Sequence, residues 1–434
     1  MSNPIELTNE EEEPPSHNGA ALDVAQGAQA IGGLIHAQPP ALVAGGQVTD
    51  RRLPLFLPEP HSRLRIAIIA NLKNNVALDS EAPPDALAEY DYLETVQSIA
   101  QVYQSAGHET FILEANKTLL DTVRQTNPDI CFNFSEGLRG EAREAHVPAL
   151  LEMLGIPYTG SNVLTSAIAL NKSMAKCVWR QHGLPTPDFQ VFHSGDEAVK
   201  AELSFPLFVK PLREGSGKGV NPLSIVHDEA HLREQARWLI KTYRQPALVE
   251  AYLPGREFTV GLIGNTRTSS QPLRSPVYNE RGFHVFPIEE VDTANTNSPG
   301  AYGISCKSVD MGDKNCPIIT IPASIPQALE MEIKQLAMDA FEALGCFDIA
   351  RVDFRLDAAG RPNLVEINQV PGLRPHQSDL CLSADAEGFP YETLVSEVLN
   401  LALERYGLLH YVRKPIPIRI GEPQQRRREE VVRR

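Results

Sequence analysis

Apolar residues near the start of the folded region alternate between strand-like runs and helix-like spacing. The run at 65–70 is compact and apolar, as in a strand that is buried on both faces. Apolar positions at 93–103 then recur every three or four residues, which is typical of a helix that packs by one side. Because short crossovers of this kind join parallel strands, the sequence predicts an α/β domain with a parallel sheet at 62–165. Its strands are expected at 65–70, 110–113 and 129–133.

The next block, 166–263, is predicted to be a smaller α+β domain. A helix that starts near Asn171 ends before Gly183 and Pro185. Asp228 is a suitable N-cap for a second helix, which reaches about Tyr243. Short apolar runs predict strands at 207–210, 224–226, 247–250 and 257–263.

Both ends of the chain are predicted to be loosely structured. Residues 1–61 begin with glutamates and continue through a stretch rich in Ala, Gly and Gln to several prolines. Such a segment has too little apolar surface to offset its ordering entropy, which predicts a disordered arm. Residues 411–434 form a polar tail rich in Arg and Glu, which either contacts an acidic partner or is simply solvated.

Composition and charge exclude several classes of protein. The chain has 434 residues and a formal net charge of −15, so nucleic acid and anionic membrane surfaces would repel it. No apolar run is long enough to span a bilayer, and the acidic start does not resemble a signal or transit peptide. The six cysteines are scattered without a CxxC pair. We therefore expect neither a disulfide framework nor a zinc site, and a cytoplasmic location.

The last block, 264–410, contains an amphipathic helix at 329–344 and then a hairpin that carries charged side chains. Residues 350–356 alternate strictly between apolar and charged positions, and 363–368 follow after a turn rich in Asp, Gly and Pro. A turn centred on 359–360 would place Asp353 opposite Glu366 and Arg351 opposite Asn368, with Val365 and Ile367 together on the other face.

Two carboxylates that face each other destabilise a hairpin unless one is protonated or a cation lies between them. With Asn368 nearby, Asp353 and Glu366 form an all-oxygen ligand set that suits Mg²⁺ or Mn²⁺ bridging phosphate oxygens. Two alternatives remain. The pair can act as general acid and base, or the hairpin can be an ordinary exposed one in which arginines neutralise the acids.

A glycine-rich loop at 213–219 and the segment 248–258 are candidates for nucleotide binding. Gly215, Gly217 and Gly219 would let backbone N–H groups approach an anion, with Lys210 and Lys218 supplying charge. The spacing is not that of a Walker A loop, and a mobile hairpin loop is the alternative. The segment 248–258 predicts only strand, turn and strand, although its two glutamates could accept hydrogen bonds from an exocyclic amine and ribose hydroxyls.

Together and in this order, these motifs resemble the ATP-grasp superfamily, and within it the D-alanine–D-alanine ligase-like family. The resemblance covers about 64–405 and leaves both ends outside. It implies an ATP-grasp fold preceded by a Rossmann-like (pre-ATP-grasp) domain. The matching segments are Leu154–Gly160, Asn171–Lys172, Val209–Pro211, Arg213–Ser216, Val249–Val260, Arg351–Phe354, Glu366–Asn368 and Pro371–Gly372.

The resemblance also implies a role for each matching residue. Nucleotide phosphates would be held by Lys172 and Lys210, with the glycine-rich loop closing over them. The resemblance further implies that the metal ligands given below bind two Mg²⁺ ions and that the catalytic residues stabilise the oxyanion of a tetrahedral intermediate. The cofactor-binding residues would be Lys172, Lys210, Gly215, Gly217, Glu250, Leu253, Glu257 and Lys307; the metal ligands Asp353, Glu366 and Asn368; and the catalytic residues Arg351, Ser216 and the backbone N–H of Gly372.

The implied activity is ATP-dependent ligation of a carboxylate to an amine through an acyl phosphate, with amino-acid substrates. Dimers are common in this branch, so the resemblance is compatible with a homodimer. Positioning and charge neutralisation suffice for such phosphoryl transfer, so no Ser/His/Asp triad is needed. The rivals are a ligase that acts on a non-amino-acid carboxylate and a non-catalytic ATP-binding regulatory or scaffold protein.

The substrate side departs from the family pattern. The first strand leads into Asn71–Asn75, without the family's glycines and its substrate-binding glutamate. Gln377 and Ser308 stand where the family has a serine and a tyrosine, whereas Ser216 is retained. We therefore expect rebuilt substrate pockets. Candidates to shape them are Asn74, Glu136, Arg139, Arg374 and Gln377.

Overall fold

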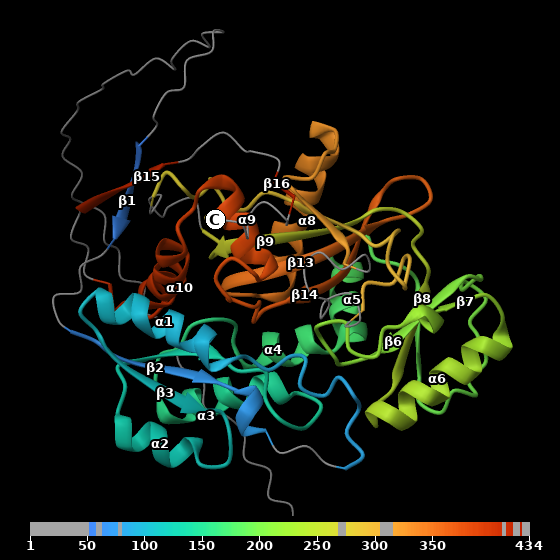
Figure 1. Ribbon diagram of the computed structural model, residues 1–434, viewed down its shortest axis with the longest axis horizontal. Coiled ribbons are helices and arrows are strands. Elements are labelled where there is room, and N and C mark those ends of the chain that lie inside the picture. Colours follow the sequence, from blue (N-terminus) through green and yellow to red (C-terminus); the bar gives the residue numbers. More distant parts are fainter. Residues whose placement is uncertain are drawn as a thin grey trace, which may run out of the picture. The chain divides into compact units, whose positions relative to one another are not determined.

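The computed structural model describes residues 52–57, 63–76, 80–267, 275–303, 316–409, 414–419 and 426–427 (Figure 1). The expected disordered arm lies mostly outside these ranges, as does Lys307. Three segments expected to be loose nevertheless form strands. β16 (Arg426–Arg427) pairs with β12 (Ile318–Ile321), and β1 (Arg52–Leu57) and β15 (Lys414–Arg419) pair antiparallel with each other. Each supplies the other's main-chain hydrogen-bond partners, a long-range pairing that composition does not reveal.

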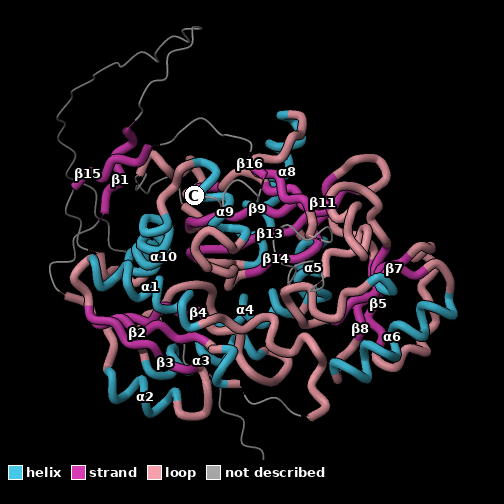
Figure 2. The backbone as a smooth tube through the Cα atoms, in the orientation of Figure 1, coloured by secondary structure: helices cyan, strands magenta, loops and turns pink. Residues whose placement is uncertain are grey.

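The N-terminal sheet is parallel, as predicted, with strand order β3-β2-β4. It is covered on both faces (Figures 1 and 2). Ile66 and Ile68 of β2 pack with α1, whereas Ala67 and Ile69 pack with α2 and α3. Burial on both faces explains why β2 is apolar throughout. The elements are β2 (Arg65–Ala70), η1 (Lys73–Asn75), α1 (Leu93–Ser105), β3 (Glu109–Glu114), α2 (Leu119–Thr126), β4 (Ile130–Phe134), η2 (Arg143–Ala145) and α3 (His146–Leu154).

The central sheet is antiparallel, in the order β5-β8-β6-β7, with α6 packed against one face. The predicted cap of α6 is present, since Asp228 accepts a hydrogen bond from the His231 backbone N–H at 2.9 Å. The elements of this region are α4 (Val163–Leu170), α5 (Lys172–Gln181), β5 (Phe189–Phe192), β6 (Leu207–Pro211), η3 (Pro222–Ser224), β7 (Ile225–Val226), α6 (Glu229–Tyr243) and β8 (Ala247–Ala251).

The largest sheet has the order β14-β13-β9-β11-β12-β16, and β10 also pairs with β9. The strand expected at 257–263 is present, but it pairs with β13 here rather than with the central sheet, because an apolar run predicts a strand without identifying its neighbour. Helix α8 packs on one face with Trp179 of α5. The elements are β9 (Glu257–Gly264), β10 (Phe283–Val285), β11 (Glu289–Asp292), β12 (Ile318–Ile321), α8 (Gln327–Leu344), β13 (Asp348–Leu356), β14 (Pro362–Asn368), α9 (Asp379–Glu387), α10 (Tyr391–Arg405) and β16 (Arg426–Arg427).

The β13–β14 hairpin has the predicted pairing at its functional end. Asp353 lies opposite Glu366, and Arg351 lies opposite Asn368. Beyond Asp353 the register shifts by one residue, so Val365 forms a β-bulge. Because of the bulge, Val365 lines a cleft together with Glu366, whereas Ile367 packs in the core. The prediction that Val365 and Ile367 share one face is therefore wrong.

Helix length and polarity bear on membrane insertion. Within the ranges given above, no helix is both long and apolar enough to cross a bilayer.

Candidate active site

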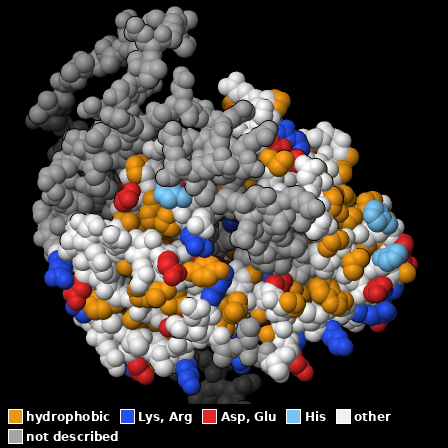
Figure 3. Space-filling view, viewed as in Figure 1, with side chains coloured by type: hydrophobic (Ala, Val, Ile, Leu, Met, Phe, Trp, Pro, Cys, Tyr) orange, Lys and Arg blue, Asp and Glu red, His pale blue; other side chains and the backbone are white. Residues whose placement is uncertain are grey.

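A cleft between the central sheet and the β13–β14 hairpin gathers most of the predicted site residues. Its walls come from β6, β8, the glycine-rich loop, β9 and the hairpin. Figure 3 shows a hollow near the middle of the visible face with Lys and Arg side chains beside it. The predicted residues in the cleft are Lys172, Lys210, Gly217, Glu250, Leu253, Glu257, Asp353 and Glu366.

A buried carboxylate between two lysines forms the floor of this cleft. Glu250 Oε1 lies 2.7 Å from Lys210 Nζ, and its Oε2 lies 3.1 Å from Lys176 Nζ. Burial alone would raise the pKa of Glu250, but the two ammonium groups outweigh it and lower that pKa. Burial lowers the pKa of Lys176 to about 8. Sequence reasoning missed Lys176, although it follows Lys172 by one helical turn.

The opposite end of the cleft presents polar groups and an aromatic wall. Arg355 Nη1 lies 3.2 Å from Glu257 Oε2 and donates to the Gly300 carbonyl at 2.6 Å. The Arg355 guanidinium also lies over the ring of Tyr252, 5.2 Å from its centre. Phe208 stacks near Tyr252, so the wall offers flat apolar surface next to hydrogen-bonding groups. This chemistry suits a nucleobase and its ribose.

The two opposed hairpin carboxylates are each neutralised by a cation of the chain. Arg351 donates two hydrogen bonds of 3.1 Å to Asp353, and its other side lies 3.3 Å from Asp379. Glu366 lies 3.3 Å from Lys172 Nζ. Burial would lower the pKa of Arg351, but its two aspartate partners raise it well above the ordinary value. Arg351 is therefore a permanent, fixed cation at this edge.

The donor set at the hairpin fits a hard divalent cation. Asp353 and Glu366 face each other from adjacent strands, and Asn368 lies two residues further along β14, where its side-chain oxygen accepts the Val370 backbone N–H at 3.1 Å. In the described part of the chain, no three acidic, His or Cys side chains are close enough to bind a metal unaided. Two carboxylates and an amide leave coordination positions open, as Mg²⁺ sites completed by phosphate oxygens require.

A second cavity adjoins the first and shares Lys172 and Glu366 with it. Gly215 and Ser216 line the second cavity, whereas Gly217 and Lys218 line the first cleft, so the glycine-rich loop is the wall between the two. The second cavity is also lined by Glu89, Glu136, Glu144 and Asn368. Of the five residues proposed to shape substrate pockets, only Glu136 lines this cavity; Asn74, Arg139 and Gln377 are exposed.

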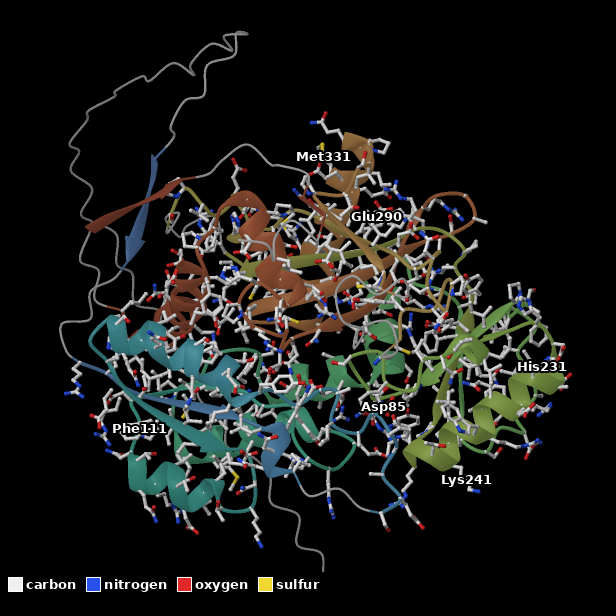
Figure 4. The ribbon with its side chains drawn as sticks, in the orientation of Figure 1. Asp85, Phe111, His231, Lys241, Glu290 and Met331 are labelled. Atoms are coloured by element: carbon white, nitrogen blue, oxygen red, sulfur yellow. The ribbon has the colours of Figure 1, made fainter. Side chains whose placement is uncertain are left out.

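Two carboxylates from the segment before α1 hold the glycine-rich loop. Glu89 accepts hydrogen bonds from the Gly215 backbone N–H, from Lys218 at 3.0 Å and from Arg143 at 2.9 Å. Asp85 accepts the Gly219 backbone N–H at 2.9 Å and is labelled in Figure 4 where this segment meets the central elements. Some N–H groups expected to bind an anion thus already bind carboxylates.

Glu89 is a residue that sequence reasoning missed. The family glutamate was sought directly after the first strand, but Glu89 lies 19 residues beyond Ala70 and reaches the loop only through the fold. Burial would raise its pKa, yet Arg143 and Lys218 outweigh that effect and lower it. The sequence feature that could have identified Glu89 is its place as an acidic residue four positions before the start of α1.

Two further predicted site residues, Gly372 and Ser216, lie in turns with little conformational freedom. A Cβ on Gly372 would lie 2.8 Å from Ser378 Oγ, so this position accepts no larger residue without a shift. Ser378 Oγ accepts the Arg374 backbone N–H at 2.9 Å, which closes the turn after the hairpin. Ser216 has a φ of 51°, a left-handed conformation that turns the loop between the two cavities.

Burial raises the pKa of Asp91 to about 7, although Lys73 and Arg374 act in the opposite direction. The pKa of Asp91 is higher in the folded than in the unfolded state, so between about pH 4 and pH 7 the folded state binds more protons. The contribution of Asp91 to the free energy of unfolding therefore falls as pH rises through this range. We expect Asp91→Asn to stabilise the protein by up to about 4 kcal/mol above pH 7, and by less at pH 5. Melting temperatures at both pH values measure this. The exposed-helix control Glu332→Gln should show no such trend, and an equal gain at both values would contradict the prediction.

Comparisons with known proteins agree with this geometry. A family model described as "D-ala D-ala ligase C-terminus" matches residues 178–400. A D-alanine–D-alanine ligase of Desulforudis audaxviator is 32% identical, with 72% of this chain and 94% of that protein covered. An uncharacterised protein of Sinorhizobium fredii is 34% identical, with 79% and 98% covered.

A solved structure shares the fold. The D-alanine–D-alanine ligase from Bacillus anthracis, complexed with ATP, superposes with a TM-score of 0.58 at 23% identity, over 79% of this chain and 99% of that one.

Proposed function

Because the chain belongs to the D-alanine–D-alanine ligase-like family of ATP-grasp enzymes, we propose that it is an ATP-dependent carboxylate–amine ligase with amino-acid substrates. The observation that carries this proposal is the convergence of Lys172 and Lys210 with Asp353 and Glu366 in one cleft. Lysines suit phosphates and paired carboxylates suit magnesium, and phosphoryl transfer needs both in one place.

The nucleotide occupies the cleft in this proposal. Lys172 and Lys210 bind its phosphates, exchanging part of their present pairing with Glu366 and Glu250. Glu250 and Leu253 border the adenine and Glu257 binds the ribose. Asp353, Glu366 and Asn368 would hold Mg²⁺, or Mn²⁺, as two ions. The metal would draw charge from the transferring phosphoryl group.

The reaction has two steps. A carboxylate oxygen of the first substrate attacks the γ-phosphorus of ATP, which forms an acyl phosphate and releases ADP. The amine of the second substrate then attacks the acyl carbon, loses a proton and expels inorganic phosphate, which leaves an amide. Arg351 and the backbone N–H of Gly372 stabilise the oxyanion of the tetrahedral intermediate. The glycine-rich loop, with Gly215 and Ser216, excludes water that would hydrolyse the acyl phosphate.

We further propose a cytoplasmic enzyme that has ATP and small carboxylate and amine substrates as its partners, and that forms a homodimer. The acidic net charge and the scattered cysteines support this setting, and neither nucleic acid nor membrane is a partner.

One observation favours a second candidate, a ligase whose first substrate is a carboxylate without an amino group. Glu89, a buried glutamate that lines the second cavity, is already paired with Arg143 and Lys218. A substrate ammonium would have to displace one of these buried cations.

A substrate screen tests the proposal and separates the candidates. Purified protein with Mg²⁺ and ATP is incubated with amino acids, singly and in pairs, and with 2-hydroxy acids, while phosphate release and new amides are measured. Amide formation from two amino acids supports the first proposal, and formation from an acid plus one amino acid supports the second. ATP binding without any amide would contradict both.

A further inference from the structure

Two cations from distant parts of the chain share a single aromatic ring. Lys73 Nζ lies 4.1 Å from the ring centre of Tyr92, and the guanidinium carbon of Arg374 lies 4.9 Å from it. Lys73 belongs to η1, just after β2, whereas Arg374 lies in the turn after the hairpin. The N-terminal sheet and the catalytic end of the largest sheet thus each contribute one charge to this pair.

Neither cationic end group is neutralised at short range. Within the described residues, no hydrogen bond or ion pair reaches the Lys73 ammonium or the Arg374 guanidinium, and both residues are partly buried. The charge of Asp91 acts on both, but burial raises its pKa to about 7, so it compensates them only in part. Two like charges at one aromatic ring, with no close counter-charge in the ranges that the structure describes, favour the binding of an anion there.

The pair also lies where the fold places ligands. In the order β3-β2-β4, the connection after β2 leads to β3 and the next one crosses back to β4. At such a switch point the crevice beyond the carboxyl ends of β2 and β4 is the usual ligand site. Lys73 follows the carboxyl end of β2 directly. Asp91 interacts electrostatically with Arg374 and also with Glu136, which lines the second cavity. Arg374 is two residues from Gly372, at the proposed reaction centre.

We propose that Lys73 and Arg374 form a subsite for a carboxylate that a substrate carries in addition to its reacting groups. The inference rests on the proposed ligase function and extends it to a substrate class, acidic amino acids or peptides with a free distal carboxylate. A guanidinium offers two parallel donors to a carboxylate, and the ring of Tyr92 fixes its plane. Local positive charge on an acidic protein also steers such anions to the crevice.

Direct binding tests the subsite without turnover. Calorimetric titration with glutarate should give a dissociation constant about tenfold higher for Arg374→Gln and for Lys73→Gln than for the unmodified protein. Arg374→Lys, which keeps the charge and loses the fork, should fall between. Lys241→Gln is the matched control, because this exposed lysine on α6 lies far from the crevice (Figure 4). Melting temperatures establish that each variant is folded.

Three results would overturn the subsite: glutarate binding that is unchanged in both glutamine variants, equal binding of glutarate and glutaramide, or tighter binding of inorganic phosphate than of glutarate. In the ligation assay, glutamate should have a lower KM than glutamine as a substrate, and Arg374→Gln should remove that difference in KM. Failure to form any amide contradicts the proposed function, whereas the glutarate titration still decides on the subsite.

Discussion

Asp353→Asn should lower the rate of amide formation about a thousandfold while the protein stays folded. The substitution keeps the side chain's size but removes the charge that faces Glu366 and that holds Arg351 through two hydrogen bonds. The proposed magnesium affinity and the position of the Arg351 guanidinium, which we propose stabilises the oxyanion, should therefore be lost together. Steady-state rates over a range of Mg²⁺ concentrations measure the effect, and the apparent requirement for Mg²⁺ should rise.

Glu332→Gln is the control for Asp353→Asn, since it removes one carboxylate from an exposed face of α8. It should leave the rate unchanged. An Asp353→Asn enzyme that kept its Mg²⁺-dependent rate would remove the hairpin from the catalytic machinery, and with it the main support for the proposed function.

Glu250→Gln should lower the free energy of unfolding by about 3 to 5 kcal/mol. The carboxylate neutralises Lys176 and Lys210, both of which are buried, so its replacement leaves two ammonium groups close together without a counter-charge. Urea denaturation followed by circular dichroism measures the loss. Saturating ATP should restore part of the stability, because phosphates supply negative charge to Lys210.

An exposed ion pair provides the comparison for Glu250→Gln. Glu229→Gln on α6 removes a carboxylate from its contact with Arg233 at the surface and should cost less than about 1 kcal/mol. A loss of that small size for Glu250→Gln would show that the buried lysines are neutralised in another way.

Local patterns predicted most of the elements and the functional end of the hairpin. Strict alternation in β13 identified its buried face, since Ala350, Val352 and Phe354 all lie in the core. The pairing of Asp353 with Glu366 followed from the turn and the side-chain period of two. Both are short-range properties, which a sequence carries directly.

Long-range contacts were the part that could not be predicted. The sheet to which β9 belongs, the bulge at Val365 and the contact of Glu89 with the glycine-rich loop depend on segments far apart in sequence. The pairing of Lys176 with Glu250 is of the same kind, because an amphipathic pattern shows that a lysine is on a helix face without showing what lies opposite. Burial and charge compensation then decide its protonation.

The bulge at Val365 separates the hairpin's tip from its catalytic end. On its other edge β13 pairs with β9 over its whole length, with Asp353 opposite Thr259, so the position of Asp353 does not depend on the tip. Residues 358–361 are exposed. An epitope or a fluorescent label inserted there would report on the protein in cells or in single-molecule experiments while leaving the chemistry intact.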